Sequence, residues 1–123
     1  MLAAASGFVS VAAGAFGAHG LEGQINAAGL AVFETAARYQ MYHALALVAV
    51  AWMSGRGLAP RPVMFAGWAF VVGTVLFSGS LYVFGLTGSR AMTWLVPLGG
   101  LGFLAGWSGL FVAALRAAGG ANR

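Results

Sequence analysis

Residues 38–43 place an arginine, two tyrosines, a glutamine and a histidine within six positions of one another. They stand out because only 7% of the 123 residues are charged. Imidazole, phenol and guanidinium groups can bind a ligand, hold a metal or move a proton. With polar residues elsewhere in the chain they define a candidate polar cluster: His19, Glu34, Arg38, Tyr39, Gln40, His43, Ser78, Ser80 and Tyr82.

The two histidines of this cluster suggest haem or metal ligation as one alternative. Haem needs imidazoles opposed across a gap, and we expect His19 and His43 on consecutive antiparallel helices at similar depth. A zinc site would need Glu34 as a further ligand. The plainer interpretation is structural, with both rings satisfied by tyrosine, serine or backbone carbonyl groups, because unpaired polar groups are costly in lipid. We therefore expect no cofactor and no metal.

Hydrolytic chemistry is a further alternative. Ser78 or Ser80, with His43 and Glu34, supplies the residue types of a catalytic triad. These types recur by chance, and only their geometry identifies a triad. We expect no catalytic residues and no enzyme.

Composition identifies the class of protein that must position these groups. With 61% hydrophobic residues and a mean hydropathy of +0.90, the chain cannot be a soluble domain, because a domain this small exposes much of its surface to water. The absence of cysteine excludes disulfides and thiolate ligands. The net charge of +4 comes from six arginines and two glutamates scattered near helix ends, which indicates contacts with lipid headgroups and no nucleic-acid partner.

At roughly 20 residues per span, the sequence predicts an all-α, integral membrane four-helix bundle. Residues 1–123 form a single domain with helices at about residues 2–18, 30–53, 63–86 and 92–116. Small residues allow membrane helices to approach closely. On the first helix the expected packing face is Ala3, Gly7, Ser10, Gly14 and Ala18. On the fourth helix it is Gly99, Gly102, Gly106 and Gly109, following a kink expected at Pro97 because proline would leave the carbonyl of Thr93 without a donor.

The arginines predict the orientation of these helices. Four spans put Arg56, Arg61, Arg116 and Arg123 on one side, against Arg38 and Arg90 on the other. The positive-inside rule then places both the N and C termini in the cytoplasm. Residues 38–43 would lie where the second helix enters the bilayer, and the polar cluster would occupy the non-cytoplasmic half.

Four motifs, in order along the chain, resemble domain-of-unknown-function family 423, also called UPF0382. They are GAFGAH at residues 14–19, YQxxH at 39–43 followed by Leu45 and Ala46, LFSGSLY at 76–82, and PxGG at 97–100 with FxxGW at 103–107. The resemblance implies a small four-helix protein of the bacterial inner membrane, or a mitochondrial one in eukaryotes, and no established activity. Relatives often carry threonine before the proline, where this chain has Val96.

Small size and the lack of a soluble domain favour a structural or accessory subunit that associates with other membrane proteins or with itself. A small transporter, or an ion or proton channel built as a homo-oligomer, is the main alternative, because an ionisable cluster inside a membrane protein is a functional-site hypothesis. A haem or metal protein using His19 and His43 ranks lower. Within the accessory interpretation, we expect His43 to fix the second helix against His19 or against the third-helix residues 78–82.

Overall fold

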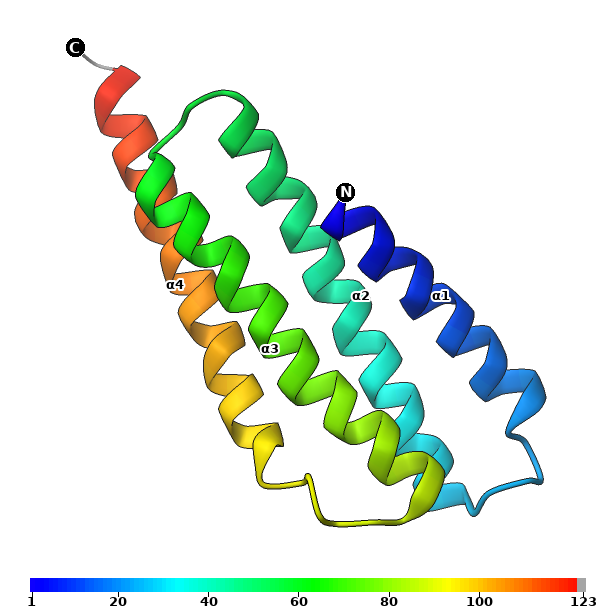
Figure 1. Cartoon of the computed structure of the whole chain (residues 1–123). Helices are drawn as coiled ribbons and strands as arrows, with labels where there is room; N and C mark the ends of the chain where they lie inside the picture. The colour runs from blue at the N-terminus through cyan, green and yellow to red at the C-terminus, as the bar shows by residue number, and fades with distance from the viewer. Residues whose placement is uncertain (122–123) are drawn as a thin grey trace.

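The computed structural model describes residues 1–121 and shows four antiparallel α-helices (Figure 1). They are α1 Leu2–Gly20, α2 Ala27–Gly55, α3 Pro60–Thr87 and α4 Leu95–Ala121. No strand occurs within residues 1–121. The predicted all-α fold with four helices is therefore confirmed. Arg123, which entered the orientation argument, lies outside the described residues, and the cytoplasmic placement of the termini stays a prediction.

Three of the helices are long and apolar enough to cross a membrane: α1, α3 and α4. The polar stretch at residues 38–43 lowers the hydropathy of α2. α2 is nevertheless a 29-residue helix packed between α1 and α3, and these neighbours help to shield its polar groups. The stretch lies near the middle of α2, and its expected position where the helix enters the membrane stays a prediction.

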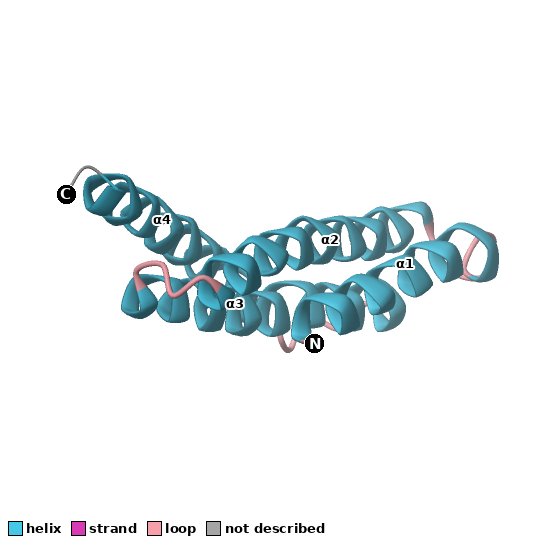
Figure 2. Cartoon of the chain, turned by 90° about the horizontal axis from the view of Figure 1, so that it is seen from above, coloured by secondary structure: helices cyan, strands magenta, loops and turns pink. Residues whose placement is uncertain are grey.

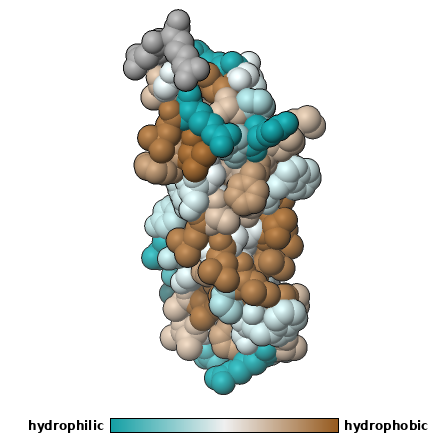
Figure 3. Space-filling view, turned by 90° about the vertical axis from the view of Figure 1, so that its left-hand side faces the viewer, coloured by the Kyte–Doolittle hydropathy of each residue, from teal (hydrophilic) through white to brown (hydrophobic). Residues whose placement is uncertain are grey.

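The helices stand in a staggered row in chain order (Figures 1 and 2). Nearly all interhelical contacts join α1 to α2, α2 to α3, and α3 to α4. The bundle is thus open, with α1 at one edge and α4 at the other. On the face shown in Figure 3, hydrophilic residues gather toward the two ends and hydrophobic residues predominate between them, as expected for a surface in contact with lipid.

Local sequence determines where α2 and α3 begin. The Asn26 side chain accepts a 2.7 Å hydrogen bond from the backbone N–H of Gly29. This cap satisfies an N–H group of the first turn, so α2 begins nearly one turn earlier than expected. α3 begins at Pro60, after Ala59 adopts a left-handed φ of 41°, because the fixed φ of proline suits the first helical position.

The predicted kink at Pro97 is wrong. α4 begins at Leu95, so Pro97 lies in the first turn, where a backbone N–H would have no partner within the helix. The carbonyl of Thr93 accepts a 3.2 Å hydrogen bond from the N–H of Val96 and is not left without a donor. The helix then continues to Ala121, beyond its expected end at about residue 116.

The glycine face of α4 lies directly against α3. A Cβ atom added at Gly106 would stand 2.5 Å from the ring of Phe70, which is completely buried. Cβ atoms at Gly99, Gly102 and Gly109 would likewise meet α3 atoms at 3.1 Å or less. The absence of side chains on these glycines is what brings the two helices together.

The packing of α1 is less extensive. Gly7 and Ser10 face α2, as expected from the small-residue pattern. Gly14 has open space around it and Ala18 is exposed. Gly17, one heptad after Ser10, is buried against α2 instead. Ser10 and Gly17 are the two buried residues of α1, so most of this helix faces outward.

Candidate functional site

Gln40 connects three helices. It is 7% exposed, and its side-chain oxygen accepts a 2.7 Å hydrogen bond from the Tyr82 hydroxyl on α3. Its Nε2 donates a 3.2 Å hydrogen bond to the backbone carbonyl of Ser6 on α1. Both ends of the amide are therefore engaged, and Gln40 holds α1 and α3 on either side of α2.

Two serines add hydrogen bonds on either side of Gln40. The Ser10 hydroxyl donates to the carbonyl of Ala37 at 2.7 Å, which joins α1 to α2. The Ser78 hydroxyl donates to the carbonyl of Ala36 at 2.9 Å, which joins α3 to α2. Small hydroxyl groups can reach a neighbouring backbone because the helices are close together here. We call these two serines, Gln40 and Tyr82 the interhelical network.

A groove opens beside this network, with α1 and α3 as its walls and α2 as its floor. We call it the α1/α3 groove. Its central part has a volume of about 240 Å³ and is lined by Leu2, Ala5, Ser6, Val9, Gln40, Leu47, Val71, Thr74 and Val75. The hydroxyls of Ser6 and Thr74 are buried and have no hydrogen-bond partner among the described residues. Two unsatisfied polar atoms therefore lie beneath the lining of the groove, which is apolar apart from Ser6, Gln40 and Thr74.

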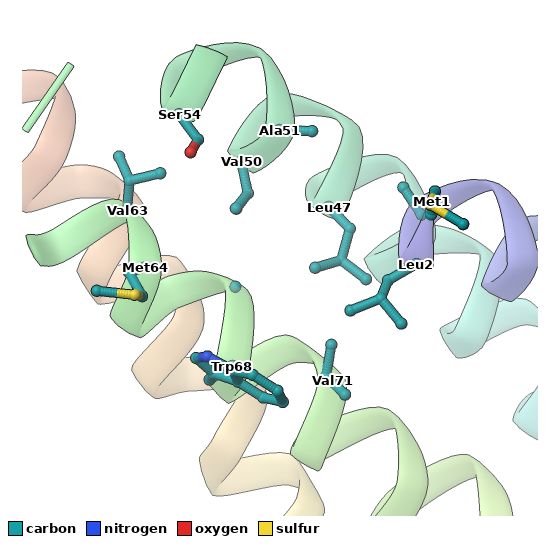
Figure 4. A pocket seen from close by; sticks show the side chains of 12 residues that line it. Met1, Leu2, Leu47, Val50, Ala51, Ser54, Val63, Met64, Trp68 and Val71 are labelled. Atoms are coloured by element: carbon teal, nitrogen blue, oxygen red, sulfur yellow. The ribbon is translucent and has the colours of Figure 1, made fainter. Parts of the chain in front are cut away.

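The groove continues along the molecule in both directions. Figure 4 shows one continuation, of about 490 Å³, where Leu47 and Val50 of α2 and Trp68 and Val71 of α3 border it beside Leu2. The other continuation, of about 410 Å³, runs between α1 and α3 and is lined by Phe8, Val9, Ala12, Ala13, Phe16, Phe33, Tyr82 and Leu86. The centre shares Leu2, Leu47 and Val71 with the first continuation and Val9 with the second. The three cavities follow one another along the α1/α3 side of the molecule, and the polar residues Ser6, Gln40 and Thr74 line the central one.

His43 belongs to a separate aromatic layer between α2, α3 and α4. Its ring stacks on Phe103 of α4, with centroids 3.5 Å apart and planes 3° from parallel. Phe70 and Trp107 lie around it at centroid distances of 5.5 and 6.4 Å. Its Nδ1 donates to the carbonyl of Tyr39 in its own helix, at 2.7 Å. His43 thus anchors α4 through ring packing.

The two histidines are too far apart to share a ligand. His19 is exposed at the end of α1. Gly17 packs against Phe33, and His43 lies ten residues beyond Phe33 along α2, which is about 15 Å at 1.5 Å per residue. The expected similar depth of His19 and His43 is therefore wrong, and so is a haem held between them. No group of three or more potential metal-ligating side chains occurs within residues 1–121.

The expected cluster thus divides into separate groups. Gln40, Ser78 and Tyr82 belong to the interhelical network, while His43 and Tyr39 belong to the aromatic layer. Ser80 is buried without a hydrogen-bond partner among the described residues. His19, Glu34 and Arg38 are exposed.

The observed partners of His43 differ from those expected for it in a catalytic triad or in a polar contact with α1 or α3. The hydroxyl of Ser78 donates to the α2 backbone, Nδ1 of His43 donates to the carbonyl of Tyr39, and Glu34 is exposed, so these three residues do not form a hydrogen-bonded triad. His43 reaches neither His19 nor the network on residues 78–82, because its stacking partner lies on α4. Ring packing on Phe103, together with the hydrogen bond to the Tyr39 carbonyl in its own helix, determines its position.

The sequence argument missed Ser6 and Thr74 as members of a site. Thr74 shares a face of α3 with Ser78 and Tyr82 at spacings of four residues, and this periodicity is a signal for it. Ser6 gives no comparable signal, since it falls beside the small-residue face of α1.

Comparison with known proteins gives consistent matches over most of the chain. Residues 13–100 match a family described as protein of unknown function (DUF423). The chain is 43% identical over 116 residues to UPF0382 membrane protein SH2409 of Staphylococcus haemolyticus, covering 94% of this chain and 93% of the relative. UPF0382 membrane protein YwdK of Bacillus subtilis is 42% identical over 116 residues, covering 94% of each chain. UPF0382 inner membrane protein YgdD of Escherichia coli is 40% identical over 119 residues, covering 94% of this chain and 88% of the relative. No solved structure matches.

Proposed function

The chain belongs to the DUF423 family, which includes the UPF0382 membrane proteins, and we propose that it is an accessory subunit that receives a transmembrane helix of another membrane protein in the α1/α3 groove. The observation that carries the proposal is the pair of buried, unpartnered hydroxyls of Ser6 and Thr74 at the centre of the groove. The proposed setting is the inner membrane, crossed several times. The role is not enzymatic.

The hydroxyls favour a protein partner over lipid alone. An unpaired polar group in an apolar environment costs free energy, and lipid acyl chains offer no hydrogen-bond donor or acceptor. A helix carrying a serine, threonine, asparagine or glutamine supplies the missing partner once the Ser6 and Thr74 side chains rotate toward the groove, from which their hydroxyls are now covered. Interhelical hydrogen bonds in membranes contribute about 0.6 kcal/mol each on average, so the two hydroxyls confer mainly position and specificity.

The shape of the groove also favours a helix. α1 and α3 form two walls that run side by side, and both present large apolar side chains there, among them Leu2, Val9 and Val75. A helix lying between the walls would contact both and would bury surface of α1 that otherwise faces outward. Nearly all interhelical contacts join consecutive helices, so none of the four helices fills the space between α1 and α3 above α2.

The transporter or channel alternative has less support in the geometry. A conducting path needs polar groups or water along its length. The polar atoms of the groove are confined to its centre, and both continuations are lined chiefly by apolar side chains. A channel could still form between several copies of the chain. Measuring the oligomeric state tests this form of the alternative.

Photocrosslinking from inside the groove tests the proposal. A photoreactive residue at Val75 lies in the groove, and one at Leu104 on α4 is a control with nearly the same exposure, 67% against 65%. After irradiation in native membranes, we expect the Val75 probe to attach to a transmembrane helix of one defined membrane protein. The adduct should contain one copy of that protein for each copy of this chain. Thr74→Val should weaken that adduct, because it removes the hydroxyl and keeps the side-chain volume.

Three results would contradict this function. Equal labelling of one protein by the Val75 and Leu104 probes would show that the groove is not the docking site. A product containing two copies of this chain would show self-association in place of a partner. Lipid adducts alone at Val75 would show that the groove faces the bilayer.

A further inference from the structure

A second surface feature lies on the other side of α3, where α3 and α4 meet near the α2–α3 connection. It is a groove of about 490 Å³ lined by Arg61, Pro62, Phe65, Ser108, Gly109, Val112 and Arg116. We propose that this α3/α4 groove binds one anionic phospholipid, with its phosphate between the two arginines and an acyl chain against the apolar residues. The site is separate from the α1/α3 groove and does not depend on the accessory function.

The positions of the two arginines support this inference. Arg61 lies in the first turn of α3, and Arg116 lies near the end of the antiparallel α4, so both exposed side chains border the same groove at the same end of the molecule. Guanidinium groups bind phosphate oxygens through paired N–H donors. Two such groups from different helices can hold one phosphate from both sides.

Below the arginines the groove becomes apolar. Phe65 follows Arg61 by four residues and Val112 precedes Arg116 by four, so each lies about one helical turn deeper. The helices close the floor of the groove, since a Cβ atom on Gly109 would lie only 3.0 Å from the Phe65 ring. A charged rim above an apolar channel matches a phospholipid, whose headgroup and acyl chain are joined in the same order.

The surrounding charges favour an anion at this end. The glutamates, Glu22 and Glu34, lie in the α1–α2 connection and the early part of α2, toward the opposite end. Arg56 is in the α2–α3 connection and packs over the Trp52 ring, with its guanidinium carbon 4.5 Å from the ring centroid. It adds positive potential without occupying the groove. Clustered arginines beside membrane helices attract anionic lipid at about 1 kcal/mol per residue.

Lipid competition on the intact chain tests the site. The protein in mild detergent is given equal amounts of phosphatidylglycerol and phosphatidylcholine with identical acyl chains, and the retained lipid is counted by native mass spectrometry. We expect the ratio of retained phosphatidylglycerol to retained phosphatidylcholine to be about fivefold for each arginine, or about 25-fold for both. Arg61→Gln with Arg116→Gln should abolish the preference, whereas the lysine double variant should retain most of it.

The control is Arg90→Gln, which removes one charge, as each single substitution Arg61→Gln or Arg116→Gln does, but from the connection at the opposite end, and it should leave the preference unchanged. Because all these arginines are exposed, the glutamine variants should melt at the wild-type temperature. Equal retention of the two lipids by the wild type would overturn the proposal, as would a preference that survives in the double glutamine variant. Displacement of the lipid by inorganic phosphate would show a site for free anions instead.

Discussion

Replacing Gly99 by alanine should weaken the α3–α4 interface, whereas the same change at the adjacent Gly100 should not. A Cβ atom at Gly99 would lie 2.5 Å from the backbone nitrogen of Phe77 and 2.8 Å from its Cα. Ordinary contacts begin near 3.4 Å, so α3 and α4 would have to separate by about 0.9 Å. A backbone atom cannot rotate away as a side chain can. Overpacking of this kind costs roughly 1–3 kcal/mol.

Gly100→Ala is a close control for this change. A Cβ atom there meets nothing within 4 Å. Both substitutions gain the same helix propensity, about 1 kcal/mol, so the difference between the two variants isolates the steric term. We expect Gly99→Ala to be the less stable by about 1–3 kcal/mol.

The two variants are compared by their unfolding in mild detergent, monitored by circular dichroism and by size-exclusion chromatography after heating. The reasoning predicts an earlier transition for Gly99→Ala and a normal or later one for Gly100→Ala. Indistinguishable transitions would refute it, because they would show that the helices separate at no cost or are not in contact at this point.

Three further predictions concern the buried polar groups. Gln40→Ala and Tyr82→Phe should be coupled in a double-mutant cycle of unfolding by about 0.6 kcal/mol, because their side chains share a 2.7 Å hydrogen bond; additive effects would contradict the bond. His43→Leu should lower the melting temperature through loss of the 3.5 Å ring stack on Phe103, an interaction worth roughly 0.5–1.5 kcal/mol; an unchanged melt would refute that role. Ser10→Ala should accelerate hydrogen exchange in α1 more than in α3 or α4, since it removes a bond between α1 and α2; uniform acceleration would contradict a local role.

The helices and one of their packing faces can be predicted from sequence because each depends on local pattern. Apolar runs long enough for a membrane span identify α1, α3 and α4, and the segment between the first two of these is long enough for a further helix, α2. The glycines of α4 recur at spacings of three and four residues, which is sufficient to place them on one face, and close approach to a neighbour follows from their size. The first residues of α2 and α4 are harder to predict from sequence. The start of α2 depends on a hydrogen-bonded cap at Asn26, and the start of α4 depends on the turn that precedes Pro97.

The site was harder to predict because a helical pattern does not say which face meets protein. On α2 the polar residues Glu34, Arg38 and Tyr42 face outward, whereas Gln40 and His43 are buried. The reason is tertiary: α2 has α1 on one side and α3 on the other, so its buried face is determined by those neighbours. His43 is buried for a similar reason, since Phe103 comes from sixty residues later in the chain.

The chain-order arrangement of the helices has a consequence for how the protein is made. Because nearly all interhelical contacts join consecutive helices, each newly synthesised helix finds its packing surface on the helix that entered the membrane just before it. The surface between α1 and α2 is therefore available as soon as both helices are made, whereas the ring of His43 on α2 is covered only when Phe103 of α4 joins it. Contacts between segments close in sequence form quickly, and chains generally fold from the N-terminus during synthesis. The order of translation is therefore also the order of assembly, and α4, which closes the row on the glycine face, is the last to join.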